Sequence, residues 1–401
     1  MIFFQKSVLF LFFFNFTISM GDTYLKQYED FINTYEKLDH IKSFEAMQEV
    51  LVLIQNILIA KYKIHITDLI MSIFTAIKYN YRSIHLYTFI VNEILASNPV
   101  SEANAVPLFA KVDTYNLHVN AYVNDLYEVE IDSDTFPDED SVQYMIMYDQ
   151  IDKFKEYITQ NSLDKVVLYV PSYPFFSPLE TCAYFGAVNI FSFLHSSLNH
   201  EISEDCLELS FIGGNTDIIN ECMKSHKLNR GCLTYIVSSH NNAFLDYVFE
   251  HELFKPKDFD YDFIINSQNL KALLLMYNLE KNSIIPWCAA FQQSLDIIKS
   301  GDLDLTRLAW DDSSLLHYCA IYDNVGVCEY LLNNSKIDIN SKDMKQNTPL
   351  HQAVTWGHKN IIELLLKHGY KDILFHDLVQ TYMPRITMDT IFLAWLQNVN
   401  A

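Results

Sequence analysis

The sequence predicts an all-α protein, with a helical N-terminal domain followed by a solenoid of paired helices joined by short hairpin loops. Three observations support this prediction. Half of the 401 residues are hydrophobic and 14% are aromatic, which is enough apolar surface for large cores. Apolar residues recur with the period of a helix through much of the chain. One segment near the C-terminus also returns upstream in recognisable copies, as stacked repeats do.

Composition excludes several classes of function. The chain has 50 acidic and 28 basic residues, so its formal net charge is −22 at pH 7. Such a chain repels phosphate backbones, which excludes general nucleic-acid binding. Glycine is scarce, and none occurs between Gly21 and Gly186. A phosphate-binding loop or a dinucleotide fingerprint cannot form in that interval, because both need glycines where the backbone approaches the ligand.

We expect no catalytic residues, no cofactor and no metal site. The sequence contains no His-Glu-x-x-His, Gly-x-Ser-x-Gly or phosphate-loop motif, which are the motifs of common hydrolases and nucleotide enzymes. His317, His351 and His358 belong to a structural repeat pattern, described below. The seven cysteines are odd in number and form no Cys-x-x-Cys motif. Reduced cysteines are typical of the cytoplasm, so we expect a cytoplasmic protein.

Residues 1–19 leave two alternatives open. Lys6 precedes a short apolar run, and small residues follow it before Met20, which is the outline of a secretory signal. A genuine signal would make the protein secreted or membrane-associated. Alternatively, translation starts at Met20 and the leader is an over-extended reading of the gene. Phenylalanine dominates the leader, whereas signal peptides favour leucine and alanine.

Residues 22–97 are predicted to form a helical N-terminal domain. Its clearest apolar face consists of Tyr24, Tyr28, Phe31, Ile32, Tyr35 and Leu38. The last helix is expected to end before Pro99, because the residue before a proline disfavours the helical conformation. Residues 98–141 are predicted to be an acidic linker or loop. From Val112 to Asp152 there are eleven acidic residues and no Lys or Arg.

The best-formed repeat lies at residues 343–369. Thr348 is a predicted helix N-cap, and Pro349 suits the first helical position through its fixed φ. His351 can reach back to Thr348 as in a capping box. Gly357 ends the first helix, because glycine enters the left-handed region at little cost. The repeat motif as a whole is Thr348, Pro349, Leu350, His351, Ala353, Gly357, His358, Leu364, Leu365 and Gly369.

The same pattern recurs upstream. Ser314 stands 34 residues before Thr348 and opens a second copy, and Ser177-Pro178-Leu179 opens a third. In the second copy Leu315 replaces the proline and Asp323 replaces the glycine, so we expect looser turns there. Faded copies fill the interval. The positions predicted to be equivalent to the first-helix glycine are Gly186, Gly214, His240, Gln268, Gln293, Asp323 and Gly357.

These copies divide the rest of the chain. We expect degenerate helical repeats at 142–300, well-formed repeats at 301–371 and a C-terminal helical cap at 372–401. No single unit can bury its apolar face alone. Stacking therefore supplies the core, and stability depends on contacts between neighbouring units.

The motif Thr-Pro-Leu-His-x-Ala, followed by Gly-His and a leucine run, resembles the ankyrin repeat. The resemblance is strong over 305–371, fair at 177–195 and weak between. The wider arrangement, with the run Cys206 to Asn215, resembles a trichomonad-type protozoan family of ankyrin proteins. In that family a domain of unknown function precedes degenerate and terminal ankyrin repeats. The resemblance implies no established biochemical activity.

The ankyrin resemblance implies binding of a partner protein through the hairpin tips and the concave helix face. By position in the repeat, the candidate binding residues are Trp310, Asp311, Ser313, Ile321, Tyr322, Met344, Lys345, Asn347, Thr355, Trp356, Tyr184 and Phe185. We therefore predict a monomeric, non-enzymatic scaffold for an unidentified protein partner. No membrane association is expected unless residues 1–19 are retained. Two alternatives remain: an exported effector that uses residues 1–19 as a signal, and an enzymatic N-terminal module with an ankyrin targeting arm.

Overall fold

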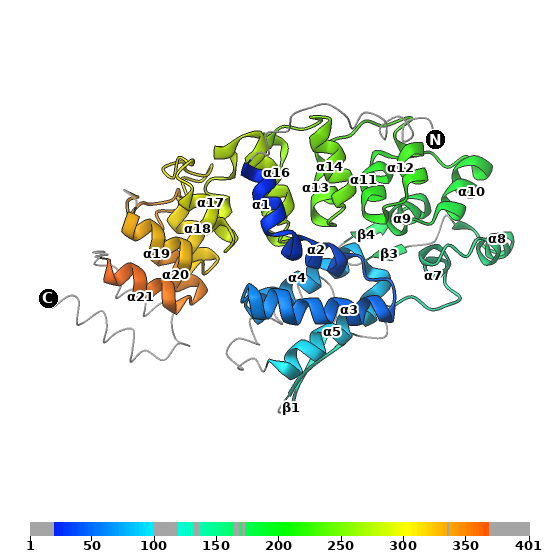
Figure 1. The fold of residues 1–401 in the computed structure, drawn as a ribbon. Helices are drawn as coiled ribbons and strands as arrows, with labels where there is room; N and C mark the ends of the chain where they lie inside the picture. The colour runs from blue at the N-terminus through cyan, green and yellow to red at the C-terminus, as the bar shows by residue number, and fades with distance from the viewer. Residues whose placement is uncertain are drawn as a thin grey trace.

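The computed structural model describes residues 20–98, 119–124, 126–131, 136–163, 168–170, 173–334 and 337–368. The predicted leader (1–19), the predicted cap (372–401) and Gly369 lie outside these residues. The described chain forms a row of helix pairs with a compact N-terminal bundle packed along one edge of the row (Figure 1). This arrangement confirms the predicted all-α architecture of a helical domain followed by a solenoid.

The N-terminal bundle is built from amphipathic helices. Their bounds are α1 (Met20–Gln27), α2 (Glu29–Asp39), α3 (Phe44–Leu53), the π-helix η2 (Ile54–Lys61), α4 (Ile66–Tyr79), the 3-10 turn η3 (Tyr81–Ser83) and α5 (Ile84–Ser97). All six residues of the predicted apolar face are buried, from Tyr24 to Leu38. The stop before Pro99 is also confirmed, since α5 ends at Ser97.

Two short antiparallel hairpins accompany the helices. The strands are β1 (Val119–Asn124), β2 (Leu126–Ile131), β3 (Leu168–Val170) and β4 (Tyr173–Phe176). The first hairpin corrects the prediction that residues 98–141 are only a linker or loop. Residues 119–131 alternate with a period of two despite their acidic charge, and their β-branched and aromatic residues favour strands.

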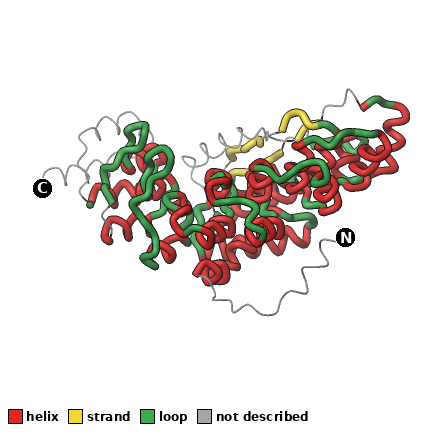
Figure 2. Tube along the Cα trace, turned by 90° about the horizontal axis from the view of Figure 1, so that it is seen from above, coloured by secondary structure: helices red, strands yellow, loops and turns green. Residues whose placement is uncertain are grey.

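The solenoid consists of eight helix pairs within the described residues, seen from above in Figure 2. Each pair has a first helix, a tight turn and a second helix. The pairs are α7 (Val142–Met147) and α8 (Ile151–Gln160), α9 (Pro178–Phe185) and α10 (Val188–Leu198), α11 (Glu204–Gly213) and α12 (Thr216–Cys222), α13 (Arg230–Ser238) and α14 (Asn242–Glu250), α15 (Tyr261–Asn266) and α16 (Leu270–Leu279), η8 (Trp287–Ala290) and α17 (Ser294–Lys299), α18 (Leu315–Ile321) and α19 (Val325–Asn334), and α20 (Pro349–Trp356) and α21 (Lys359–Lys367). Two further 3-10 turns, η6 (Pro256–Asp258) and η7 (Lys281–Ile284), lie in the connections.

The tight turns follow one backbone rule even where glycine has been lost. A residue one or two positions after the first helix has positive φ in six of these pairs, at Gly186, Gly214, His240, Gln268, Asp323 and Gly357. Asp149 does the same between α7 and α8. The predicted equivalence of Gln293 is wrong, because its φ is −63° and η8 is only a 3-10 turn.

The turn at Asp323 is not loose, which corrects that expectation. The Asn324 N–H donates to the Cys319 carbonyl at 3.0 Å. The equivalent bond in the last repeat, from His358 N–H to the Ala353 carbonyl, is 2.9 Å. Asp tolerates the left-handed conformation better than most residues, so it substitutes for glycine with the same geometry.

At four of these turns the residue after the positive-φ position ties the turn to the preceding repeat. The Asn241 side chain donates to the Phe211 carbonyl at 3.0 Å, and Asn269 donates to the Val237 carbonyl at 2.8 Å. Asn324 binds the Ala289 carbonyl in the same way, at 2.9 Å. In the last repeat, His358 Nδ1 lies 2.8 Å from the Ala320 carbonyl. An asparagine thus replaces the histidine of the ankyrin Gly-His pair.

The N-terminal bundle covers the edge at which first helices end and second helices begin, here called the turn edge. In Figure 1, α1 lies beside α16 and α2 lies under the middle of the row. The Tyr28 hydroxyl donates to the Asp296 carboxylate at 2.7 Å. Asn242 donates to the Glu36 carboxylate at 2.8 Å. At α18 the cover ends, where His65 lies 3.7 Å from Asp323.

Candidate protein-interaction surface

The hairpin tips of the last two repeats are ordered by aspartates. Asp343 accepts a hydrogen bond from the Asn347 N–H at 2.8 Å. Asp311 has the same role in the preceding repeat, where it accepts from the Ser313 N–H at 3.1 Å. The Met344 N–H donates to the Asp311 carbonyl at 2.9 Å, which joins the two tips. Residues at these tips are therefore held in fixed positions on the solenoid.

Both terminal first helices begin with the predicted capping box. In α20, Thr348 Oγ1 and His351 Nδ1 are 2.6 Å apart, and Pro349 follows the cap. In α18 a Ser314–His317 box does the same without a proline. His317 Nε2 lies 3.1 Å from the Asn347 carbonyl and donates to it, since Nδ1 accepts from the Ser314 N–H. Burial lowers the pKa of His317, in keeping with a neutral ring.

The remaining motif residues have structural positions. Leu350, Ala353 and Leu365 are fully buried between helices, whereas Leu364 is only half-buried. Gly357 has φ +74°, so an alanine there would be strained. The repeat motif therefore builds the scaffold and leaves binding to other positions.

Five of the ten candidate binding residues of the terminal repeats are exposed. Trp310 is 80% exposed, Met344 61% and Trp356 47%. Lys345 and Thr355 are also exposed. The half-buried candidates are Asp311, Ile321, Tyr322 and Asn347. Exposed tryptophan on a rigid element is typical of interface anchors.

A polar cavity of about 410 Å³ lies between the hairpin tips and the exposed side of α20. Four candidate binding residues line it, namely Asp311, Lys345, Asn347 and Thr355. Asp343, His351 and Gln352 complete the lining. The structure thus brings these candidates together on one surface. Ser313 does not belong to it, because its side chain is buried and bonds to Asp311 at 3.0 Å.

Tyr184 and Phe185 are corrections to the predicted surface. By position in the repeat they match Thr355 and Trp356, but both are buried under the N-terminal bundle. The Tyr184 hydroxyl donates to the Lys78 carbonyl at 2.6 Å, and Arg82 donates to the Phe185 carbonyl at 2.7 Å. Their contacts are intramolecular. The sequence could not reveal this, because the bundle that covers them comes from residues about a hundred positions earlier.

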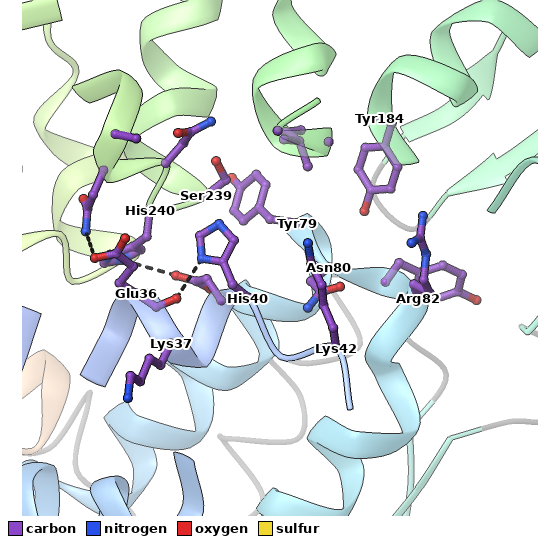
Figure 3. Close-up of a pocket in the computed structure, with 18 of the residues that line it drawn as sticks. Glu36, Lys37, His40, Lys42, Tyr79, Asn80, Arg82, Tyr184, Ser239 and His240 are labelled. Atoms are coloured by element: carbon purple, nitrogen blue, oxygen red, sulfur yellow. Dashed lines mark hydrogen bonds and ion pairs between the residues drawn. The ribbon is translucent and has the colours of Figure 1, made fainter. Parts of the chain in front are cut away.

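A second cavity, of about 580 Å³, lies between the bundle and the turn edge (Figure 3). Glu36 and His40 approach it from the bundle and His240 from the repeats. The His240 ring is buried, stacks on Tyr35 at 5.9 Å and donates from Nε2 to the Ser267 carbonyl at 2.7 Å. Burial lowers the pKa of His240 to about 4.

The charged groups around this cavity serve the joint. Asp39, buried 3.4 Å from His240, has its pKa raised by burial. Lys37 pairs with Glu49, and Arg82 caps α9. Asp39 and Arg82 thus contact the repeats, and Lys37 is paired within the bundle, so we assign no reaction to this cavity.

Other kinds of site find no support in the described residues. No three His, Cys, Asp or Glu side chains there are grouped to hold a metal ion. Among the helices described, none combines the length and the apolar character that crossing a bilayer requires. The seven cysteines are buried and unpaired. Burial raises the pKa of each of their thiols, which makes them poor nucleophiles.

Comparison with known families agrees with this architecture. Residues 266–376 match a family described as ankyrin repeats in three copies. The C-terminal helix pairs are ankyrin repeats. Residues 198–276 match a family described as a domain of unknown function (DUF3447). This second match falls among the units predicted as degenerate ankyrin repeats, whereas the resemblance had implied a domain ahead of them.

Several curated proteins share short stretches with the chain. Alpha-latrotoxin-Lt1a of Latrodectus tredecimguttatus is 38% identical over 14% of this chain and 4% of its own length. Human transient receptor potential cation channel subfamily A member 1 is 38% identical over 15% and 6%. The 26S proteasome non-ATPase regulatory subunit 10 of Dictyostelium discoideum is 36% identical over 15% and 25%. The chain therefore spans a quarter or less of these relatives, and the likeness supports a general role in protein interaction.

Proposed function

We propose that the protein is a non-enzymatic scaffold that binds a partner protein through its last two ankyrin repeats. The binding surface consists of the hairpin tips and the exposed side of the terminal first helices. One observation carries the proposal: Trp310, Met344 and Trp356 are exposed on the last two repeats, while Phe185, which is equivalent to Trp356, is already covered by the chain's own N-terminal bundle.

The proposal extends to the roles of the chain's segments and to its family. The N-terminal bundle (22–97) acts as an intramolecular cover for the degenerate repeats (142–300), and the well-formed repeats (301–371) carry the free surface. We further propose a cytoplasmic monomer of the trichomonad-type ankyrin family. The run from Cys206 to Asn215 in the degenerate units and the order of the segments support that family.

The experiment compares proteins captured by the wild-type chain with those captured by a Trp310→Ala/Trp356→Ala variant, using quantitative mass spectrometry. We expect the specific partner to fall about tenfold or more in the variant, since exposed tryptophans dominate interface energetics. The melting temperature should stay nearly unchanged, because neither side chain is buried.

The matched control is Leu198→Ala, which removes an apolar side chain that is 42% exposed on another repeat. It should capture the same partner as the wild type. Equal capture by all three proteins would refute the proposal. A large fall in melting temperature for the tryptophan variant would show that these side chains belong to the core.

A further inference from the structure

An aromatic row crosses three consecutive repeats just before the terminal one. It consists of Tyr261 at the start of α15, Trp287 in η8, and Tyr318 and Tyr322 on α18. The Tyr261 and Trp287 rings are stacked 3.8 Å apart, Trp287 and Tyr318 meet edge-on at 6.4 Å, and Tyr318 and Tyr322 lie 6.2 Å apart. Tyr261, Trp287 and Tyr322 are half-buried, so part of each ring remains accessible.

Three carboxylates flank this row: Asp260, Asp262 and Asp311, together called the acidic flank. Asp262 is exposed at the start of α15. Crowding by the surrounding protein and the negative charges of Asp260 and Asp311 raise its pKa. The charge of Asp262 also contributes to raising the pKa values of Tyr318 and Tyr322, which places it close to the row.

The acidic flank has no cationic partner within the described part of the chain. The ion pairs of the neighbouring units use other acids: Arg230 pairs with Asp258, and Arg307 lies 3.7 Å from Glu280. Asp260 and Asp311 accept only backbone and hydroxyl hydrogen bonds from their own turns. One exposed cation, Lys345, lines the neighbouring cavity with Asp311. Arg307 also lies near Tyr261 but is engaged with Glu280, so three carboxylates against the Lys345 ammonium leave a negative surface.

We propose that the aromatic row and the acidic flank together dock a basic segment of the partner protein, in which arginine or lysine side chains lie against the rings. The proposal rests on the proposed function and names the chemistry of the partner. A guanidinium or ammonium group gains from an aromatic face and from a carboxylate at once. An acidic segment would be repelled by the flank, and an apolar segment would leave three carboxylates without a partner.

The test measures binding of a fluorescent arginine–serine repeat peptide to the full-length protein by anisotropy. The flank variant carries Asp260→Asn, Asp262→Asn and Asp311→Asn, in which residues 260 and 311 each keep one side-chain oxygen to accept the backbone N–H of the turn. A control variant removes three charges on or near the second helices, with Glu329→Gln, Asp338→Asn and Glu363→Gln. We expect the flank variant to bind about tenfold more weakly and the control variant to bind within about twofold of wild type.

Tyr322→Leu tests the row separately and should weaken the peptide about threefold or more at unchanged flank charge. A glutamate–serine peptide of the same length should not bind. Equal weakening of peptide binding by the flank and control variants would overturn the inference, since only the total charge would then matter. Unchanged peptide binding in both variants would overturn it as well. If Trp310→Ala/Trp356→Ala abolishes partner capture while the flank variant does not affect peptide binding, this inference fails and the proposed function stands.

Discussion

Removing the hydroxyl of Tyr184 tests whether the N-terminal bundle and the repeats form one structural unit. The side chain is 2% exposed, and its hydroxyl donates to the Lys78 carbonyl at 2.6 Å. Lys78 belongs to the last turn of α4, where carbonyls lack a partner within the helix. Tyr184→Phe therefore deletes a partly buried hydrogen bond between two segments that are far apart in the sequence.

The expected cost of Tyr184→Phe is about 1 kcal/mol in the free energy of unfolding, because a partly buried carbonyl loses this hydrogen bond. Tyr184→Ala should cost about 3–5 kcal/mol, since it also leaves a cavity between Phe176 and Phe185. Both values come from urea denaturation followed by circular dichroism. Partner capture should not change in Tyr184→Phe, because this residue faces the bundle and no partner.

Tyr247→Phe is the control for the same chemical change at a site that is 39% exposed. It should alter stability by less than about 0.5 kcal/mol. If Tyr184→Phe and Tyr247→Phe shift the urea midpoint equally, the bundle does not pack on the turn edge as described. The reasoning about covered repeats would then be refuted.

Two further predictions concern the turns. Gln268 has φ +54°, so Gln268→Gly should raise the free energy of unfolding by about 0.5 kcal/mol in urea titrations; a loss of stability would show that the turn is unstrained. His240 has a folded pKa of about 4, below its unfolded value near 6.5. Between about pH 4 and 6.5, position 240 therefore binds more protons in the unfolded chain than in the folded one. The free energy of unfolding should thus fall as the pH drops from about 6.5 to about 4. His240→Asn, which tolerates the positive φ, should flatten this pH dependence, and parallel stability curves for variant and wild type would contradict the assignment.

Local chemistry made the terminal repeats predictable from the sequence. The capping box of Thr348 and His351, the proline at the first helical position and the left-handed Gly357 each depend on residues within a few positions. The same applies to the helical face of the N-terminal bundle from Tyr24 to Leu38. Such signals survive in a single sequence because the interactions they report are short-range.

Long-range packing accounts for what the sequence did not predict. Tyr184 and Phe185 occupy repeat positions that are exposed in the last unit at Thr355 and Trp356, and only the folded chain brings the bundle over them. The aromatic row and its acidic flank were missed for the same reason. Tyr261 and Trp287 lie in the faded repeats, where no motif sets their register. A pattern of alternating residues was available for the β1–β2 hairpin, but the acidic charge of that region suggested a loop.

Contacts with the N-terminal bundle offset the loss of a consensus glycine at His240. A residue such as His240, at φ +49°, strains its turn more than glycine would. Its ring gains contact with Tyr35 of the bundle and a hydrogen bond to the next repeat, and these interactions offset the strain. In the last repeat Trp356 is 47% exposed. This repeat keeps the left-handed Gly357 in the turn that follows Trp356, and it keeps the full capping box. The covered α13–α14 repeat thus exchanges a consensus glycine for contacts with the bundle, whereas the covered α9–α10 repeat keeps both Gly186 and its capping box.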